Sequence, residues 1–276
     1  MKRILTAVIL IPCALFLVFL GPRWQWLFVL AAAAVATLAV WECLDLARRN
    51  GFQPGRFAVV AALLALFAGN YEWPDRTAIL LGALSLGLLV YCTFRRPPER
   101  VLGDAAASIF SLVYVGFTLI ALPTLRAQPN GSSLLTFLFC VVWSGDIAAL
   151  YVGRAVGRHK MTRVLSPNKT WEGAAGSMVA SLLVAGGLYW AASAMETWSA
   201  PLLSYPDELW YWLVLAALVN VAGQVGDLAE SALKRSAGVK DSGNLLPGHG
   251  GVLDRIDALM LAAPVMWYAV VIRQMF

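Results

Sequence analysis

A short region between two long apolar runs, Ser231–Asp257, carries side chains of the kinds that bind phosphate. Lys234, Arg235 and Lys240 are cations close together in the chain, and such cations hold phosphate oxygens. Glycines follow them, and a backbone without Cβ atoms lets its N–H groups approach a phosphate closely. The region therefore predicts a phosphate-binding loop. Its glycines are Gly248, Gly250 and Gly251, with His249 among them.

Carboxylates flank this loop on both sides. Asp254 and Asp257 are spaced i, i+3, so both lie on one face of a helix. Upstream, Asp227 shares a predicted helical face with Glu230 and Lys234. Hard oxygen ligands beside a phosphate-binding loop suit Mg²⁺. The alternative is a solvated loop between two membrane helices, but such a loop needs no carboxylates in the mouths of both flanking helices.

A second group of polar side chains lies at 143–173. Asp146 is well inside an apolar run, where a carboxylate costs about 3 kcal/mol unless it is satisfied. It is a functional candidate, or else it makes a structural hydrogen bond between helices. Lys169 and Thr170 stand at the entry to the next predicted helix, and a helix N-terminus beside a lysine and a hydroxyl is a phosphate site. Glu172 follows directly; a plain basic loop is the alternative.

The composition is that of a polytopic membrane protein. Of the 276 residues, 60% are hydrophobic and only 13% are charged, about half the charged fraction of a soluble domain. Mean hydropathy is +0.71. The net charge of +5 is interpreted as the excess of lysine and arginine that membrane proteins carry in their cytoplasmic loops. No nucleic-acid partner is therefore expected. The four cysteines lie in or beside apolar runs and are interpreted as small buried hydrophobic residues.

Apolar runs long enough to cross about 30 Å of hydrocarbon predict an all-α membrane helix bundle of about nine transmembrane helices. The predicted division is 1–126, with about five N-terminal membrane helices, and 127–276, a C-terminal catalytic region with two cytoplasmic loops. The runs are 4–20, 25–46, 57–71, 76–94, 104–125, 133–153, 172–195, 207–230 and 253–272.

Orientation follows from the basic residues. With the N-terminus in the cytoplasm, most of the 21 lysines and arginines fall on the cytoplasmic side, as the positive-inside rule requires. The loops that hold the distinctive chemistry, 154–171 and 231–252, are then both cytoplasmic.

The region Ser231–Asp257 resembles the signature of the phosphatidate cytidylyltransferase family, also called CDP-diacylglycerol synthases. Residues 143–173 are similar to the family's other typical run, except that Leu150 followed by Tyr151 stands where the family has Tyr. The matched signature positions are Ser231, Leu233, Lys234, Arg235, Lys240, Asp241, Gly243, Leu246, Pro247, His249, Gly250, Gly251, Val252, Asp254, Arg255, Ile256 and Asp257.

The resemblance implies an integral-membrane nucleotidyltransferase that converts CTP and phosphatidate to CDP-diacylglycerol and pyrophosphate in phospholipid biosynthesis. It also implies a multi-pass homodimer in the bacterial inner membrane, with the site on the cytoplasmic side. Mg²⁺ is the expected cofactor, and whether a second, monovalent cation joins it is left open. The expected catalytic residues are Asp227, Lys234, Arg235, Asp254 and Asp257. The expected phosphate ligands are Lys169, Thr170, Lys234, Arg235, Lys240, His249, Gly250 and Gly251. The expected metal ligands are Asp227, Asp254 and Asp257, with Asp146 and Glu172 in reserve.

Other functions compete with this one. Asp146 and Asp227 could carry ions in a secondary transporter, although no internal repeat is visible. A related enzyme, such as a prenol kinase or an archaeal-type CDP-lipid synthase, would share the build. A non-catalytic scaffold has no use for so many intramembrane carboxylates.

Overall fold

The computed structural model describes residues 12–197, 202–245 and 250–275, and within these ranges the chain is helical without strands. This confirms the predicted all-α fold. Residues 12–19 are helical, and a π-helical stretch, Leu112–Phe117, follows α5 directly. The further helices are α2 (Gln25–Arg49), α3 (Arg56–Glu72), α4 (Thr77–Arg95), α5 (Pro98–Ser111), α6 (Ala121–Arg126), α7 (Gly131–Val156), α8 (Trp171–Thr197), α9 (Leu209–Ser236) and α10 (Leu253–Gln274).

Seven stretches of helix in the described residues are long and apolar enough to cross a bilayer. Two of the nine predicted runs are not among them. The first part of 4–20, up to residue 11, lies outside the described residues, and 57–71 forms α3, whose 17 residues make it short for a span. The run predicted at 104–125 is part of a longer stretch, Pro98–Arg126. The count of nine and the cytoplasmic N-terminus stay predictions.

The chain forms two compact units, and the division cuts across α9 and α10. The first unit holds the described residues of Met1–Thr124 together with Ala232–Ile256, so the glycine-rich region folds with the N-terminal helices. The second unit holds Leu125–Ser231 and Asp257–Phe276. The functional division predicted at residue 126 stays a prediction.

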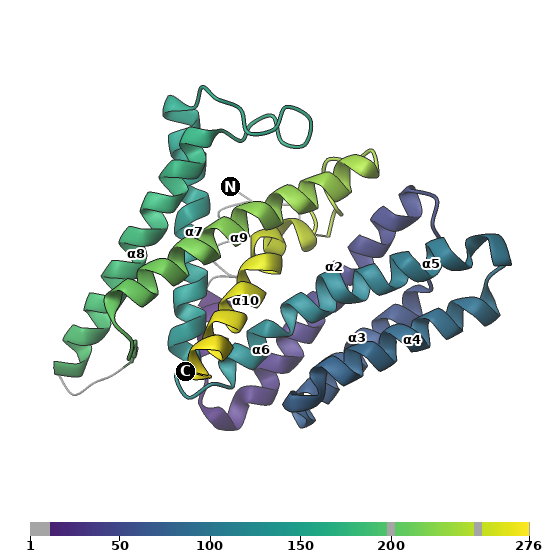
Figure 1. The fold of residues 1–276 in the computed structure, drawn as a ribbon, viewed down its shortest axis with the longest axis horizontal. Helices are drawn as coiled ribbons and strands as arrows, with labels where there is room; N and C mark the ends of the chain where they lie inside the picture. Colours follow the sequence, from purple (N-terminus) through teal and green to yellow (C-terminus); the bar gives the residue numbers. More distant parts are fainter. Residues whose placement is uncertain (1–11, 198–201, 246–249, 276) are drawn as a thin grey trace. The chain divides into compact units, whose positions relative to one another are not determined.

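In the first unit, α2 packs on α3, α3 on α4 and α4 on α5 (Figure 1). The packed face of α2 is built from small and medium side chains, among them Ala36, Val40 and Leu44, which are fully buried. Leu63 and Leu66 of α3 are equally buried. These helices therefore hold the C-terminal half of α2 in a fixed position, and Glu42 lies in that half.

In the second unit, α7 and α8 run side by side and make the most extensive helix contact of the fold (Figure 1). Glycines allow this contact. A Cβ at Gly176 would lie 2.7 Å from a methyl group of Val152, and a Cβ at Gly173 would lie 2.9 Å from the carbonyl oxygen of Ala149. Small residues commonly bring membrane helices together in this way. The close approach places the end of α7, with Asp146, against the start of α8.

A hydrogen-bonded cluster joins α9 to this pair inside the membrane-spanning region. The Asn220 amide donates to Ser177 Oγ at 2.7 Å and to Ser181 Oγ at 2.8 Å, and the Gln224 amide donates to Asn220 Oδ1 at 2.6 Å. Gly145 of α7 lies against this cluster: a Cβ there would come within 3 Å of side-chain atoms of Asn220, Ser177 and Ser181. The cluster fixes α9 against α8, and it sets the position of Asp227, one turn beyond Gln224.

Candidate functional site

The carboxylate of Asp254, in the first turn of α10, is enclosed by donors from the glycine-rich region. Its Oδ1 accepts from Lys234 Nζ at 2.6 Å. Its Oδ2 accepts from the N–H groups of Gly251 at 2.8 Å and Ser242 at 2.9 Å. The side chain is nearly buried, with 5% of its surface exposed. Both oxygens therefore face fixed positive charge or fixed N–H dipoles, and Lys234 is held at a defined place beside the loop.

Glu42 of α2 is a second buried carboxylate at this site, and no motif in the sequence indicates it. Its Oε1 accepts from the N–H of Val252 at 3.0 Å, and its Oε2 accepts from the N–H of Leu253 at 2.8 Å. The Ser242 hydroxyl lies 2.9 Å from Glu42 Oε2 and 3.0 Å from Asp254 Oδ2. Because one hydroxyl carries one proton, Ser242 can donate to only one of these carboxylates at a time. Glu42 therefore caps the start of α10.

Three glycines of the region are explained by these two carboxylates. A Cβ at Gly243 would lie 2.5 Å from Glu42 Oε1, and one at Gly251 would lie 2.3 Å from Glu42 Oε2. A Cβ at Gly250 would lie 2.7 Å from Asp254 Oδ2, and this residue has a φ of +78°, which favours glycine in any case. The glycines make room for carboxylates next to the backbone.

Of the other predicted residues of this unit, two lie at its surface, one is buried and one lies outside the described chain. Lys240 and Arg235 are exposed, and the Arg235 guanidinium donates to the Val239 carbonyl at 3.1 Å. Gly251 is buried, and its N–H is engaged by Asp254. His249 falls outside the described residues. The phosphate-binding roles of Lys240, Arg235, Gly251 and His249 stay predictions, as does that of Gly250.

In the second unit, Asp146 and Asp227 line one cavity of about 230 Å³ between α7, α8 and α9. Lys169 lies beside them, and its Nζ is 2.6 Å from Asp227 Oδ2. Asn168 and Gln224 also belong to the lining. The structure therefore brings four of the predicted residues to one cavity, namely Asp146, Lys169, Thr170 and Asp227.

Thr170 and Glu172 shape the entrance to α8. The buried Thr170 hydroxyl accepts from the Gly173 N–H at 3.1 Å, as an N-cap residue does. Glu172 is not in the lining of the cavity. It accepts from the His159 N–H, and the His159 ring Nδ1 lies 2.6 Å from its Oε1. Both side chains therefore order the loop that carries Lys169, and their predicted phosphate and metal roles remain untested.

Asp257 also belongs to the second unit, where α9 and α10 approach closely at Gly226. A Cβ at Gly226 would lie 2.6 Å from the carbonyl oxygen of Asp257. Asp227 and Asp257 thus come from neighbouring positions of two adjoining helices. Asp254 falls in the first unit, so the predicted Asp227–Asp254–Asp257 metal set draws on both units and stays a prediction.

The donor chemistry fits a hard cation best at the cavity of the second unit. Asp146 and Asp227 offer carboxylate oxygens there, and the ammonium of Lys169 already occupies a cationic position next to Asp227. Asp254 is different, because both of its oxygens already accept hydrogen bonds, one from Lys234 and the other from N–H groups of the loop, and a metal ion would have to displace these donors. Among the residues that the structure describes, no three His, Cys, Asp or Glu side chains form a ready metal-binding group.

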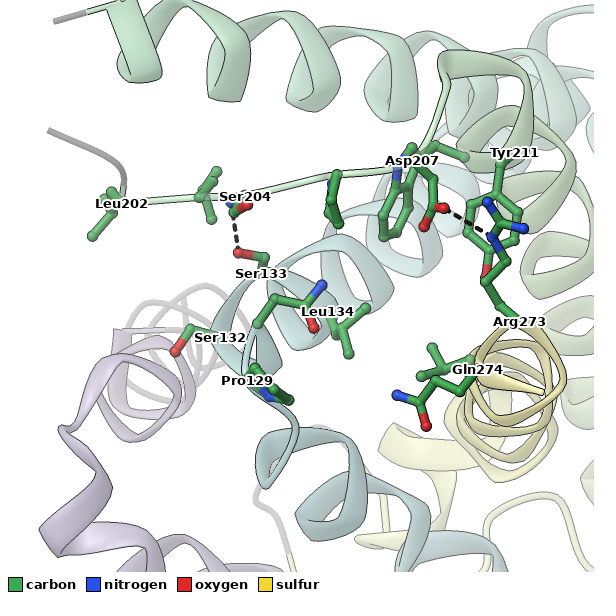
Figure 2. A pocket seen from close by; sticks show the side chains of 15 residues that line it. Pro129, Ser132, Ser133, Leu134, Leu202, Ser204, Asp207, Tyr211, Arg273 and Gln274 are labelled. Carbon is green, nitrogen blue, oxygen red and sulfur yellow. Dashed lines mark hydrogen bonds and ion pairs between the residues drawn. The ribbon is translucent and has the colours of Figure 1, made fainter. Parts of the chain in front are cut away.

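A larger cavity, of about 590 Å³, lies at the other ends of α7 and α9 (Figure 2). Figure 2 shows the Asp207–Arg273 ion pair on one side of it and the Ser204–Ser133 hydrogen bond on another. Arg273 is the single cation among its described lining residues, and it is paired. Burial raises the pKa of the adjacent Tyr205 phenol, whose hydroxyl donates to the Ser133 carbonyl. This cavity therefore lacks the several cations that a triphosphate needs.

Comparison with known proteins gives a consistent picture. A family model described as "Cytidylyltransferase family" matches residues 1–273. A phosphatidate cytidylyltransferase of Brucella suis biovar 1 (strain 1330) is 39% identical over 272 residues, which cover 96% of this chain and 91% of that protein. Proteins of the same name are 37% identical in Pseudomonas aeruginosa, over 96% of this chain and 94% of that protein, and 33% identical in Staphylococcus haemolyticus, over 96% of each.

Proposed function

We propose, because this chain belongs to the cytidylyltransferase family, that it is a membrane enzyme that joins CTP to phosphatidate and yields CDP-diacylglycerol and pyrophosphate. The observation that carries the proposal is the family match over residues 1–273, together with relatives named phosphatidate cytidylyltransferase that cover nearly all of the chain. The reaction suits the fold, since one substrate is a lipid and the apolar helices of this chain are long enough to span a bilayer.

The chemistry requires positioning and charge neutralisation more than a strong base. A phosphate oxygen of phosphatidate attacks the α-phosphorus of CTP, a new P–O bond forms, and the bond from the α-phosphorus to the bridging oxygen breaks as pyrophosphate leaves. The attacking oxygen is already anionic near pH 7. In phosphoryl transfer of this kind, catalysis comes from alignment and from cations that neutralise the charge on the phosphates.

Cations of both units are available for this task. Lys234 is fixed by Asp254, and the exposed Arg235 and Lys240 follow it toward the glycine-rich loop. Lys169 is fixed by Asp227 in the cavity of the second unit. In each pair the carboxylate holds the ammonium in place before substrate arrives, so little ordering is required on binding. We assign these cations to the substrate phosphates.

Mg²⁺ is the cofactor that we propose for this site. Asp227 and Asp146, which line one cavity, would hold it, with Asp257 of the same unit as the further ligand expected from the signature. When bound, the ion would supply charge stabilisation for the triphosphate and the leaving pyrophosphate.

The cellular setting is also a proposal. Multiple apolar helices and bacterial relatives indicate a bacterial membrane protein. The distribution of basic residues supports an inner-membrane location with the site on the cytoplasmic side, where CTP is available. A homodimer follows from the family resemblance alone, and light scattering of the detergent-solubilised protein would test it.

The direct test is an assay of purified protein with radiolabelled CTP and phosphatidate, with and without Mg²⁺. The expected product is labelled CDP-diacylglycerol, with one pyrophosphate released for each CTP consumed. Polyprenol and polyprenol phosphate serve as alternative acceptors. Labelling of either of these, with none of phosphatidate, would refute the proposed substrate and favour a related lipid enzyme.

A further inference from the structure

We infer that Glu42 is a positioning residue of the nucleotidyl-transfer site, and that the N-terminal helices act through it on the glycine-rich region. The inference rests on the proposed function for its catalytic consequence, but its geometry stands on the contacts of Glu42 alone. Glu42 lies in α2, far upstream of the stretch that carries the motif, and it makes sequence-distant hydrogen bonds with separations of 200 to 211 residues.

The first argument is the cost of placing this side chain where it is. Glu42 is seven residues before the end of α2 at Arg49, which is about 10 Å along a helix. Only 7% of the residue is exposed. An ionised carboxylate in such a position is strongly unfavourable unless donors satisfy it. A hydrophobic residue would pack there at no such cost, so the carboxylate has a purpose other than filling space.

The second argument is that Glu42 contacts the two ends of the region at once. Its two oxygens accept from consecutive N–H groups, those of Val252 and Leu253, at the start of α10. Ser242, ten residues earlier in the loop, also places its hydroxyl 2.9 Å from Glu42 Oε2. A single side chain thus closes the loop from 242 to 252 at its base. The favourable helix dipole at the N-terminus of α10 adds to the attraction.

The third argument connects Glu42 to the reactive part of the site. The Ser242 hydroxyl that Glu42 contacts is also 3.0 Å from Asp254 Oδ2, and Asp254 in turn holds Lys234. The backbone N–H groups of Ser242 and Gly251 that orient Asp254 belong to the same closed loop. A change in the position of Glu42 therefore moves the donors of Asp254 and, through them, the ammonium of Lys234.

The test compares Glu42→Gln with Asp45→Asn, a neutralisation three residues further along the same helix. Asp45 pairs with Arg56, and no hydrogen bond joins it to the part of the glycine-rich region that the structure describes. Hydrogen exchange, read by mass spectrometry on peptides of residues 238–256, reports the N–H groups of Ser242, Val252 and Leu253 directly. Glu42→Gln should increase exchange there at least tenfold and leave peptides of α7 unchanged. Asp45→Asn should leave both regions as in the wild type.

The kinetic arm uses the same two variants with CTP and phosphatidate. Glu42→Gln should lower kcat by about 10-fold to 100-fold with the protein still folded, and Glu42→Asp should recover part of this loss because it retains the charge. Wild-type exchange at 238–256 in Glu42→Gln would overturn the inference, whatever the activity. Faster exchange with unchanged kcat would overturn the catalytic part. A wild-type protein without transferase activity would instead refute the proposed function. The hydrogen-exchange measurement would still test whether Glu42 holds Ser242, Val252 and Leu253 in place.

Discussion

Replacing Asp254 by asparagine should separate the structural cost of this site from its catalytic role. Asparagine retains one oxygen and exchanges the other for an NH₂ group. That group must face either Lys234 Nζ, now 2.6 Å from the carboxylate, or the N–H groups of Gly251 and Ser242 at 2.8 and 2.9 Å. In both orientations a donor meets a donor. Lys234, whose side chain is 13% exposed, loses its anion as well.

The magnitude follows from the loss of a nearly buried ion pair. Removing one partner of such a pair costs about 3 kcal/mol of stability, because the attraction between the two charges is lost while the ammonium of Lys234 stays largely buried. Without Asp254, Lys234 is no longer held in position for the substrate phosphates. This should lower kcat by about 100-fold to 1000-fold, as the removal of one charge-stabilising donor does in other enzymes. Thermal unfolding in detergent measures the first quantity, and the radiolabelled CTP assay measures the second.

The double variant Asp254→Asn/Lys234→Met is the control. It also removes the ammonium that Asp254 no longer holds, so stability should return in part while activity stays low. Asp207→Asn serves as a matched neutralisation, because Asp207 forms the more exposed ion pair with Arg273 at the other cavity. It should change neither the stability nor kcat much. The reasoning fails if Asp254→Asn turns over near the wild-type rate, or if the double variant recovers turnover along with stability.

Three other predictions follow from the same contacts. Gly251→Ala should lower activity at least tenfold, because its Cβ would lie 2.3 Å from Glu42 Oε2. The control Gly87→Ala, on α4 with open space around it, should be neutral. Equal activities of the two variants in the assay would contradict this prediction. Lys240→Ala should raise KM for CTP or phosphatidate several-fold, and Arg76→Ala should not; unchanged KM values for both substrates would remove Lys240 from the site. Chelation with EDTA should abolish turnover and added Mg²⁺ restore it, so activity that persists in EDTA would exclude the proposed cofactor.

The membrane fold could be predicted from the sequence because hydropathy alone fixes which segments are helical in lipid. The lengths of α7, α8, α9 and α10 were close to the predicted runs for this reason. The run at 104–125 was placed too late, since Pro98 can open a helix at a position where charged residues hide the apolar signal.

The candidate site was predictable only in part. Asp146 and Asp227 stood out because a carboxylate in an apolar run is costly, and the structure places both at one cavity. Glu42 met the same criterion and was missed, because the charged residues that follow it, Asp45, Arg48 and Arg49, make it look like part of a solvated helix end. The glycines were interpreted as phosphate ligands, but their spacing could not show that carboxylates press against them. Such contacts between distant segments have no local signal in the sequence.

The hydrogen bonds of Glu42 impose an order on the making of this protein. Ribosomes add about 5–20 residues per second. The roughly 200 residues between Glu42 and its hydrogen-bond donors therefore take on the order of 10–40 s to be synthesised. During that interval α2 is already translated, while Ser242 and the two backbone N–H groups that will donate hydrogen bonds to the Glu42 carboxylate do not yet exist. The nascent chain must therefore keep this helix end near water or a translocation channel, and the N-terminal half cannot reach its final arrangement until the last helix has been inserted.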